Sequence, residues 1–429
     1  MDEELNRILD LVKKHNIWRK VECINLIASE NITSPLVDVV YLSDAMHRYA
    51  EGLPYKRFYQ GTKYIDEIEV LASSLFASLL EAKYADLRPL SGTLANASTF
   101  AALAEFGDAA AIFPLPGGGH VSHSEYGILG KLGIKPYPLP IIEEEMNIDI
   151  DKAIKLIRLI KPKFVTLGAT VILFPHPVKE LSLVTREVDA KLIFDAAHVL
   201  GLIMGGVYPN PLKEGADILT TSTHKTFPGP QGGAIATNDE GLFKKVRRIV
   251  FPVFVSNHHL HRLAAIAVTA LEMKYFGKRY AEQIIKNAKK LAEELYNGGF
   301  KVLCADKGFT QTHQVVVDVR EEGGGKKCAE VLEEANIIVN KNMLSWDKPS
   351  DVHNPSGIRI GVQEVTRLGM KEEDMVEIAR FIYRLLKRKE DPVTVRKDVI
   401  EFRKSFTKVH YTFEVDIKKT FNELYFSLI

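Results

Sequence analysis

The stretch that decides the fold runs from Lys191 to Gly233 and reads KLIFDAAHVLGLIMGGVYPNPLKEGADILTTSTHKTFPGPQGG. Two short apolar runs in it, Lys191–Phe194 and Asp217–Thr220, have the length and composition of buried strands. Asp195 ends the first run, and Lys225 lies five residues after the second. Ligands bind outside the carboxyl ends of the strands in an open parallel sheet. We therefore expect Asp195 and Lys225 to border the same crevice.

Two earlier runs of the same kind, Ala109–Phe113 and Lys163–Gly168, alternate with helical stretches. This alternation predicts an α/β fold with a mainly parallel sheet. From about Ala264 a single long helical pattern continues to the glycines at 298 and 299, where a helix can stop. The segments beyond that helix predict a smaller α+β domain, with strands at Phe300–Ala305, His313–Arg320 and Ile358–Val362 and a helix at Cys328–Ala335.

These patterns predict an N-terminal arm at residues 1–48 and a large α/β domain at 49–265. Residues 266–429 are expected to form a hinge helix, the small α+β domain and a tail. The tail after Leu386 is of mixed polarity. We expect it to pack on the C-terminal domain or on a partner subunit.

Composition narrows the possible partners. The chain has 429 residues, with 56 basic and 55 acidic side chains and a net charge of +1. Charges balanced in this way produce no overall electrostatic field that would attract nucleic acid or an anionic membrane. A small-molecule partner is therefore expected. The acidic N-terminus does not resemble a signal peptide, and the most apolar run, Phe164–Phe174, is too short to span a bilayer. Three widely spaced cysteines fit a reduced cytosol and offer neither a disulfide framework nor a thiolate metal site.

A lysine amine can form a Schiff base with a carbonyl, and pyridoxal phosphate is the cofactor that uses such a bond as an electron sink. The sink works best when an aspartate keeps a proton on the ring nitrogen. Asp195 and Lys225 have the order that this arrangement needs, although aspartates at strand ends are common in α/β folds. Ser91, Gly92 and Thr93 begin a helical stretch and could bind a phosphate, or could simply cap that helix.

The loop Pro116–His120 contains three consecutive glycines. Glycine lets the backbone approach a flat ligand, on which the His120 imidazole could stack. The alternative interpretation is an ordinary flexible turn.

Together these residues resemble the serine hydroxymethyltransferase family, pyridoxal-phosphate enzymes of the aspartate-aminotransferase fold. Members convert serine and a reduced pterin to glycine and the methylene pterin. The matching blocks follow the family's order over roughly residues 20–370, and an ordered set is far more specific than any one motif. They are LIASEN (26–31), YAEG (49–52), KRFYQG (56–61), SGTLAN (91–96), GGH (118–120), DAAHVLGL (195–202), GVYPNP (206–211), THK (223–225), VNKN (339–342) and SGIRIG (356–361).

The resemblance implies a role for each matching residue. Lys225 would bond to the cofactor, His120 would stack on its ring, Glu51 would act as acid and base, and Tyr59 would orient the substrate. The implied cofactor-binding residues are Ser91, Gly92, Thr93, His120, Thr170, Asp195, His198, Ser222, His224, Lys225 and Asn257. The implied substrate-binding residues are Ser29, Tyr49, Glu51, Tyr59, His198 and Arg359, and those for the pterin are Leu115, Gly119, His120, Val121 and Asn342.

The sequence departs from the family pattern in a few places. The glycine-rich loop usual after Phe251-Pro252 is replaced by residues 253–259, so we expect Ser256 or Asn257 to supply its contact with the partner subunit's cofactor phosphate. Gln231 stands where GPRGG has its arginine, and Phe58 replaces a tyrosine. A zinc site at His258, His259 and His261 is disfavoured because no carboxylate lies beside them at ligand spacing.

By resemblance the protein is expected to be a cytoplasmic homodimer or higher homo-oligomer, with either tetrahydrofolate or tetrahydromethanopterin as the pterin. Two other functions stay open. One is a pyridoxal-phosphate aldolase that cleaves threonine or another β-hydroxy amino acid without a pterin. The other is a non-catalytic scaffold, disfavoured by the absence of a basic patch and the presence of Lys225 and Glu51.

Overall fold

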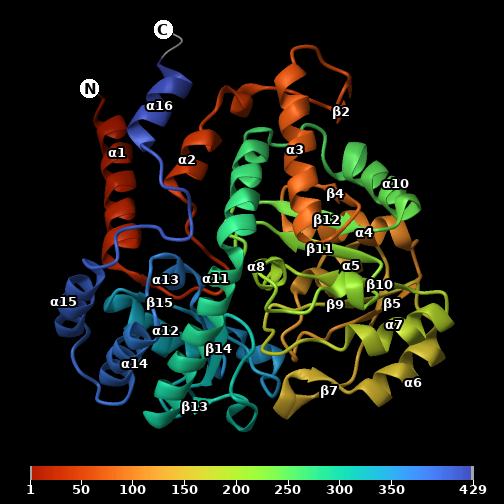
Figure 1. The fold of residues 1–429 in the computed structure, drawn as a ribbon. Coiled ribbons are helices and arrows are strands. Elements are labelled where there is room, and N and C mark those ends of the chain that lie inside the picture. The colour runs from red at the N-terminus through yellow and green to blue at the C-terminus, as the bar shows by residue number, and fades with distance from the viewer. Residues whose placement is uncertain (1, 427–429) are drawn as a thin grey trace. The chain divides into compact units, whose positions relative to one another are not determined.

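The computed structural model describes residues 2–426, and residues 1 and 427–429 lie outside the description (Figure 1). The chain forms two compact units. The larger unit contains Asn31–Glu282 together with the chain from Tyr411 onward, and the smaller unit contains the chain up to Glu30 together with Gln283–His410. Each unit has its own sheet.

Within the described residues, the larger unit is built on a seven-stranded sheet in the order β4-β12-β11-β10-β9-β5-β6. The five strands from β11 to β6 run parallel to one another, and β12 is antiparallel to both of its neighbours, β11 and β4. The predicted α/β class and the mainly parallel sheet are therefore confirmed. The strands are β4 (Tyr84–Asp86), β5 (Ala109–Ile112), β6 (Lys135–Pro138), β9 (Phe164–Leu167), β10 (Lys191–Asp195), β11 (Ile218–Ser222) and β12 (Gly233–Thr237).

Helices cover this sheet, and two short hairpins lie apart from it (Figure 1). The hairpins are β2 (Gly52–Leu53) with β3 (Lys56–Arg57), and β7 (Ile141–Ile142) with β8 (Asn147–Ile148). The helices of the larger unit are α2 (Pro35–Tyr41), α3 (Lys63–Leu79), α4 (Gly92–Leu103), α5 (Ile128–Lys131), α6 (Ile150–Ile160), α7 (Val178–Glu187), α8 (Leu200–Met204), α9 (Pro211–Glu214), α10 (Glu240–Arg248) and α16 (Ile417–Tyr425), of which α2 and α16 contact each other.

Both faces of strand β10 are buried, which explains its uninterrupted apolar run. Ile193 belongs to a core cluster with Phe100 of α4 and Phe164 of β9, whose rings stack 5.1 Å apart. Its neighbour Phe194 contacts the ring of His176 instead, at 6.3 Å. Because side chains alternate along a strand, Asp195 points to the same face as Ile193, toward α4.

The smaller unit contains an antiparallel sheet in the order β13-β14-β17-β16 and a parallel pair of β1 with β15. This agrees with the predicted α+β character. Its strands are β1 (Ile24–Asn25), β13 (Lys301–Val302), β14 (Gln314–Asp318), β15 (Ile337–Ile338), β16 (Asn340–Asn342) and β17 (Gly357–Gly361). Its helices are α1 (Glu3–Asn16), α12 (Gly325–Glu334), α13 (Gln363–Arg367), α14 (Glu372–Leu386) and α15 (Pro392–Arg403), and the chain passes between the units along α11 (His261–Asn297).

The boundaries of the two units differ from the expected ones at 48/49 and 265/266. Contacts between residues far apart in the sequence explain the difference. In the smaller unit, Ile24 pairs with Ile337 across the β1–β15 register. In the larger unit, the tail beyond 410 is anchored by Tyr425, whose hydroxyl donates to the carbonyl of Val39 at 2.6 Å. The part of the tail beyond 410 therefore packs with the larger unit, whereas α15, in the earlier part of the tail, contacts α12 and α14 of the smaller unit, as predicted. None of the described helices combines the length and the apolarity that a membrane crossing requires.

A buried carboxyl group makes the stability of the smaller unit depend on pH. Burial raises the pKa of Glu364 from 4.5 to about 7, although Asn25 donates to its Oε1 at 2.7 Å. The folded state thus binds this proton more tightly than the unfolded chain, and the cost of ionising Glu364 grows as pH rises from 4.5 through 7.

We predict that Glu364→Gln, which keeps the acceptor and removes the titration, stabilises the protein by up to roughly 3 kcal/mol at pH 8 and hardly at all near pH 4.5. Urea denaturation at several pH values measures the difference. Glu330→Gln, on the exposed surface of α12, is the matched control and should show no such trend. A benefit of Glu364→Gln that does not change with pH would contradict the account.

Candidate active site

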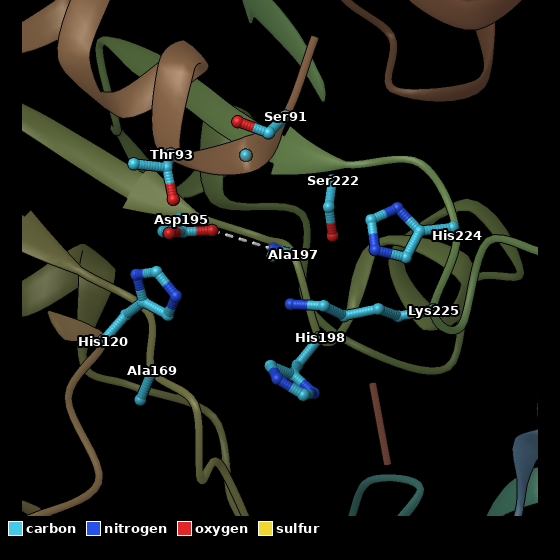
Figure 2. A pocket seen from close by; sticks show the side chains of 11 residues that line it. Ser91, Thr93, His120, Ala169, Asp195, Ala197, His198, Ser222, His224 and Lys225 are labelled. Atoms are coloured by element: carbon cyan, nitrogen blue, oxygen red, sulfur yellow. Dashed lines mark hydrogen bonds between the residues drawn. The ribbon is translucent and has the colours of Figure 1, made fainter. Parts of the chain in front are cut away.

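The larger unit has a pocket at the carboxyl ends of β10 and β11, as expected from the sequence (Figure 2). Its volume is about 200 Å³. The amine of Lys225 points into the space bordered by Asp195, His120 and His198. The complete lining is Ser91, Gly92, Thr93, His120, Ala169, Asp195, Ala197, His198, Ser222, His224 and Lys225.

Asp195 is buried, and three groups surround its carboxylate. Asn96 Nδ2 donates to Oδ2 at 2.8 Å, and His123 Nε2 lies 3.2 Å from the same oxygen. The backbone N–H of Ala197 donates to Oδ1 at 3.0 Å. Burial alone would raise the pKa of Asp195, but the contacts from His123 and Asn96 outweigh it and hold the pKa well below its ordinary value. The pocket thus contains a carboxylate that stays ionised.

Asn96 connects this carboxylate to the neighbouring strand and to the loop after β5. Its Oδ1 accepts from the hydroxyl of Thr220, which lies opposite Asp195 in the β10–β11 register. Its Nδ2 also donates to Ser122 Oγ at 3.0 Å, and Ser122 Oγ is 2.7 Å from His120 Nδ1. A single buried amide therefore links the positions of Asp195 and His120.

The residues around Lys225 explain its unusual sequence setting. Thr223 Oγ1 donates to the carbonyl of Pro230, which closes the turn that follows the lysine. Thr226 Oγ1 donates to the carbonyl of His198 and so ties the lysine turn to the start of α8. Asn31 Nδ2 donates to the carbonyl of Lys225 itself at 2.5 Å. Its flanking hydroxyls and the Pro-Gly run thus fix the backbone of Lys225.

The start of α4 supplies hydrogen-bond donors at one side of the pocket. Ser91 is the N-cap residue of α4 and accepts from the N–H of Leu94 at 3.1 Å. Gly92 lies against β11, because a Cβ there would be 3.4 Å from the Cβ of Ser222. The Ser222 hydroxyl is buried and has no hydrogen-bond partner among the residues that the structure describes. A helix N-terminus with a spare hydroxyl suits a bound phosphate.

A second cation lies behind this helix start. The Arg262 guanidinium is buried and donates to the carbonyls of Pro89, at 3.1 Å, and Gly233, at 3.4 Å. Burial lowers the pKa of Arg262 to about 10, so it remains charged at neutral pH. Burial, followed by the charges of Lys225 and Arg262, lowers the pKa of His224 to about 4. This side of the pocket is therefore electropositive, with His224 neutral.

Some residues that the resemblance assigns to the cofactor or pterin do not line the pocket. Ala169 lines it in place of the expected Thr170, whose backbone N–H donates to the carbonyl of Gly118. Leu115 is half-buried, and Val121 is exposed. The glycines at 117–119 are explained by the chain's own packing, because a Cβ at Gly119 would lie 2.4 Å from the carbonyl oxygen of residue 113. Contacts within the chain therefore explain why these positions are glycine, whereas the sequence pattern predicted that they would admit a flat ligand.

Asn257 and Glu51 also lie outside the pocket lining. Both polar atoms of the Asn257 side chain contact the backbone of residues 48 and 50. Glu51 Oε1 accepts from Ser256 Oγ at 2.5 Å. Tyr49 and Tyr59 are exposed, with ring centroids 5.3 Å apart.

Three expected site residues belong to the smaller unit. Arg359, in β17, is buried and donates through Nε to Asn340 Oδ1 at 3.1 Å. Burial lowers the pKa of Arg359 to about 10, so its guanidinium stays charged at neutral pH. Ser29 is half-buried, and Asn342 Nδ2 donates to the carbonyl of Met343.

The histidines near the start of α11 do not form a metal centre. His258 precedes the helix, and its Nε2 lies 3.1 Å from Oε2 of Glu69, which is 189 residues earlier in the chain. The rings of His259 and His261 stack with centroids 5.7 Å apart. Across residues 2–426, no group of three or more His, Cys, Asp or Glu side chains could hold a metal ion.

Sequence reasoning missed Asn96, His123 and Arg262 as parts of the site. Asn96 was visible as the last residue of SGTLAN, one turn beyond the helix start. His123 lies three residues after His120, and nothing in that spacing indicates that its side chain reaches Asp195. No sequence pattern indicates Arg262, because it reaches the loop of Gln231 from a different part of the chain. Its guanidinium occupies the space that a Cβ at Gly232 would need.

Comparison with known proteins shows the family of the chain. The family model for serine hydroxymethyltransferase matches residues 1–382. The serine hydroxymethyltransferase of Staphylothermus marinus is 62% identical over 96% of this chain and 94% of its own length. That of Sulfolobus acidocaldarius is 59% identical over 97% of this chain and 96% of its own length.

Among solved structures, the L-threonine transaldolase from Pseudomonas fluorescens, in its internal aldimine state, superposes with a TM-score of 0.89. It is 30% identical, and the match covers 98% of this chain and 97% of that one. The family model and the two relatives extend over nearly the whole chain. The protein belongs to the serine hydroxymethyltransferase family.

Proposed function

We propose that the protein transfers the hydroxymethyl group of serine to a reduced pterin, giving glycine and the methylene pterin, with pyridoxal phosphate as its cofactor. One observation supports this proposal most directly. Lys225 and an ionised Asp195 line the same pocket, in a chain that is 62% identical to a serine hydroxymethyltransferase. The pterin is tetrahydrofolate or tetrahydromethanopterin. We further propose a cytoplasmic location and a homodimer or larger homo-oligomer, the latter supported by the apolar side chains that α1 leaves exposed, Leu5, Ile8, Leu9 and Val12.

The residues of the pocket fit pyridoxal phosphate. The α4 N-terminus at Ser91, Gly92 and Thr93, together with the unpartnered hydroxyl of Ser222, matches the donors that a phosphate needs. The buried charge of Arg262 adds to the attraction for a phosphate dianion. Asp195, in the same lining, is the residue that would keep a proton on the ring nitrogen.

Bound pyridoxal phosphate supplies an electron sink for the α-carbon of an amino acid. The protein's own groups do the rest of the work. Lys225 provides the amine that bonds to the cofactor, His120 provides the flat ring for stacking, and Arg359 provides a planar fork for the substrate carboxylate. Glu51 would accept and return the proton of the serine hydroxyl, with Tyr59 orienting the substrate. Leu115, Gly119, Val121 and Asn342 are the residues that we assign to the pterin.

The aldolase alternative is not favoured. The relatives at 59–62% identity are named serine hydroxymethyltransferases, whereas the threonine transaldolase is 30% identical. An assay of glycine formation from serine with tetrahydrofolate, with tetrahydromethanopterin and with neither separates the two activities. We expect rapid glycine formation only with a pterin. Equal rates with and without a pterin, or cleavage of threonine faster than of serine, would support the aldolase.

The charge of Asp195 can be tested separately. We predict that Asp195→Asn, which preserves size, lowers kcat for serine by about 100-fold or more because the pocket loses its only described carboxylate. Steady-state kinetics with serine and the preferred pterin measure the effect. Asp217→Asn is the matched control, since Asp217 accepts from the N–H of Leu192 near the other end of the same strands and is absent from the lining. Equal effects of the two substitutions would contradict the assignment.

A further inference from the structure

The loop that carries Glu51 is held from one side by Asn257. The Asn257 side chain accepts from the N–H of Ala50 at 3.0 Å and donates to the carbonyl of Arg48, also at 3.0 Å. Ala50 is fully buried. One amide side chain thus satisfies a donor and an acceptor of the loop backbone on the N-terminal side of Glu51.

Arg57 holds the same loop on both sides of Glu51. Its Nη1 donates to the carbonyls of Ala50 at 2.7 Å and Gly52 at 3.0 Å. The guanidinium is buried and is itself fixed by Asp66, at 2.7 Å, and Glu69, at 2.5 Å. Such a paired and fully bonded cation is hard to displace, because moving it would take its charge away from two buried carboxylates.

The residues on either side of Asn257 contribute as well. Ser256 Oγ donates to Glu51 Oε1, the group proposed to exchange protons with the substrate. His258 Nε2 contacts Glu69 Oε2, so it supports the carboxylate that fixes Arg57. Three consecutive residues therefore converge on the Glu51 loop, and they lie in the stretch that replaces the family's glycine-rich sequence. If this replacement of the glycine-rich sequence affected only the protein surface, three consecutive side chains would not be expected to converge on one loop.

We propose that Ser256 and Asn257 are positioning residues that hold the Glu51 carboxylate in place for proton exchange with the substrate. Asn257 fixes the backbone on which Glu51 stands, and Ser256 orients the carboxylate itself. This inference rests on the proposed function, in which Glu51 is the acid and base. A general acid or base is effective only within hydrogen-bond reach of its proton, so freedom of the loop would cost rate rather than binding.

The test compares Asn257→Ala and Ser256→Ala in the cofactor-loaded enzyme. We expect kcat for serine to fall by about 10- to 100-fold in each, while KM for serine and the dissociation constant of pyridoxal phosphate stay unchanged. Ser256→Thr restores a hydroxyl and should recover most of kcat. Hydrogen exchange should speed up at the amide of Ala50 in Asn257→Ala, but not in Ser256→Ala, because only Asn257 bonds that amide.

Asn238→Ala is the matched control, since Asn238 also accepts a backbone N–H, that of Lys83 at 2.9 Å, in a turn away from Glu51. It should leave kcat at the wild-type value. Unchanged kcat in Asn257→Ala with faster exchange at Ala50 would overturn the inference, and so would a parallel loss of kcat and cofactor affinity in both variants. Failure of the proposed function is distinguishable, because it would show in the wild-type enzyme as serine turnover that needs no pterin.

Discussion

An ionised carboxylate held inside the protein is the constraint on which the rest of the larger unit depends. Asp195 can be buried and charged only because Asn96, His123 and the N–H of Ala197 surround it with donors. Those donors come from α4, from the loop after β5 and from the turn after β10. Stacking of Phe100 on Phe164 fixes α4 against the sheet, and so places Asn96 over the end of β10.

The site contains charges of both signs. Asp195 is negative, while Lys225 and the α4 N-terminus in the same lining are positive, and the buried Arg262 donates to the backbone just before that helix start. A flat ligand with a basic ring nitrogen and a phosphate matches this distribution, since each end meets the charge that favours it. The neutral state of His224, which follows from its burial between two cations, removes a third positive charge from the phosphate side.

The sequence predicted the parts of the site that follow from strand periodicity and local motifs. Asp195 and Lys225 were predictable because parallel strands end at one edge of a sheet, and Ser91 was predictable as a helix cap. The partners of Asp195 were not, because pairwise contacts between residues so far apart in sequence leave no local pattern. The same limit explains why the contacts of the Asn257 side chain with the loop of Glu51 could not be predicted. It also explains the tail, which Tyr425 ties to Val39 in the larger unit.

The most direct test of the central claim is to identify the lysine that bonds to the cofactor. The purified protein is loaded with pyridoxal phosphate, reduced with borohydride to make the bond permanent, digested and analysed by mass spectrometry. The account predicts a single modified peptide, with the pyridoxyl group on Lys225, the amine that faces Asp195 in the pocket. Modification of a different lysine, or several lysines modified to similar extents, would contradict the assignment of this pocket.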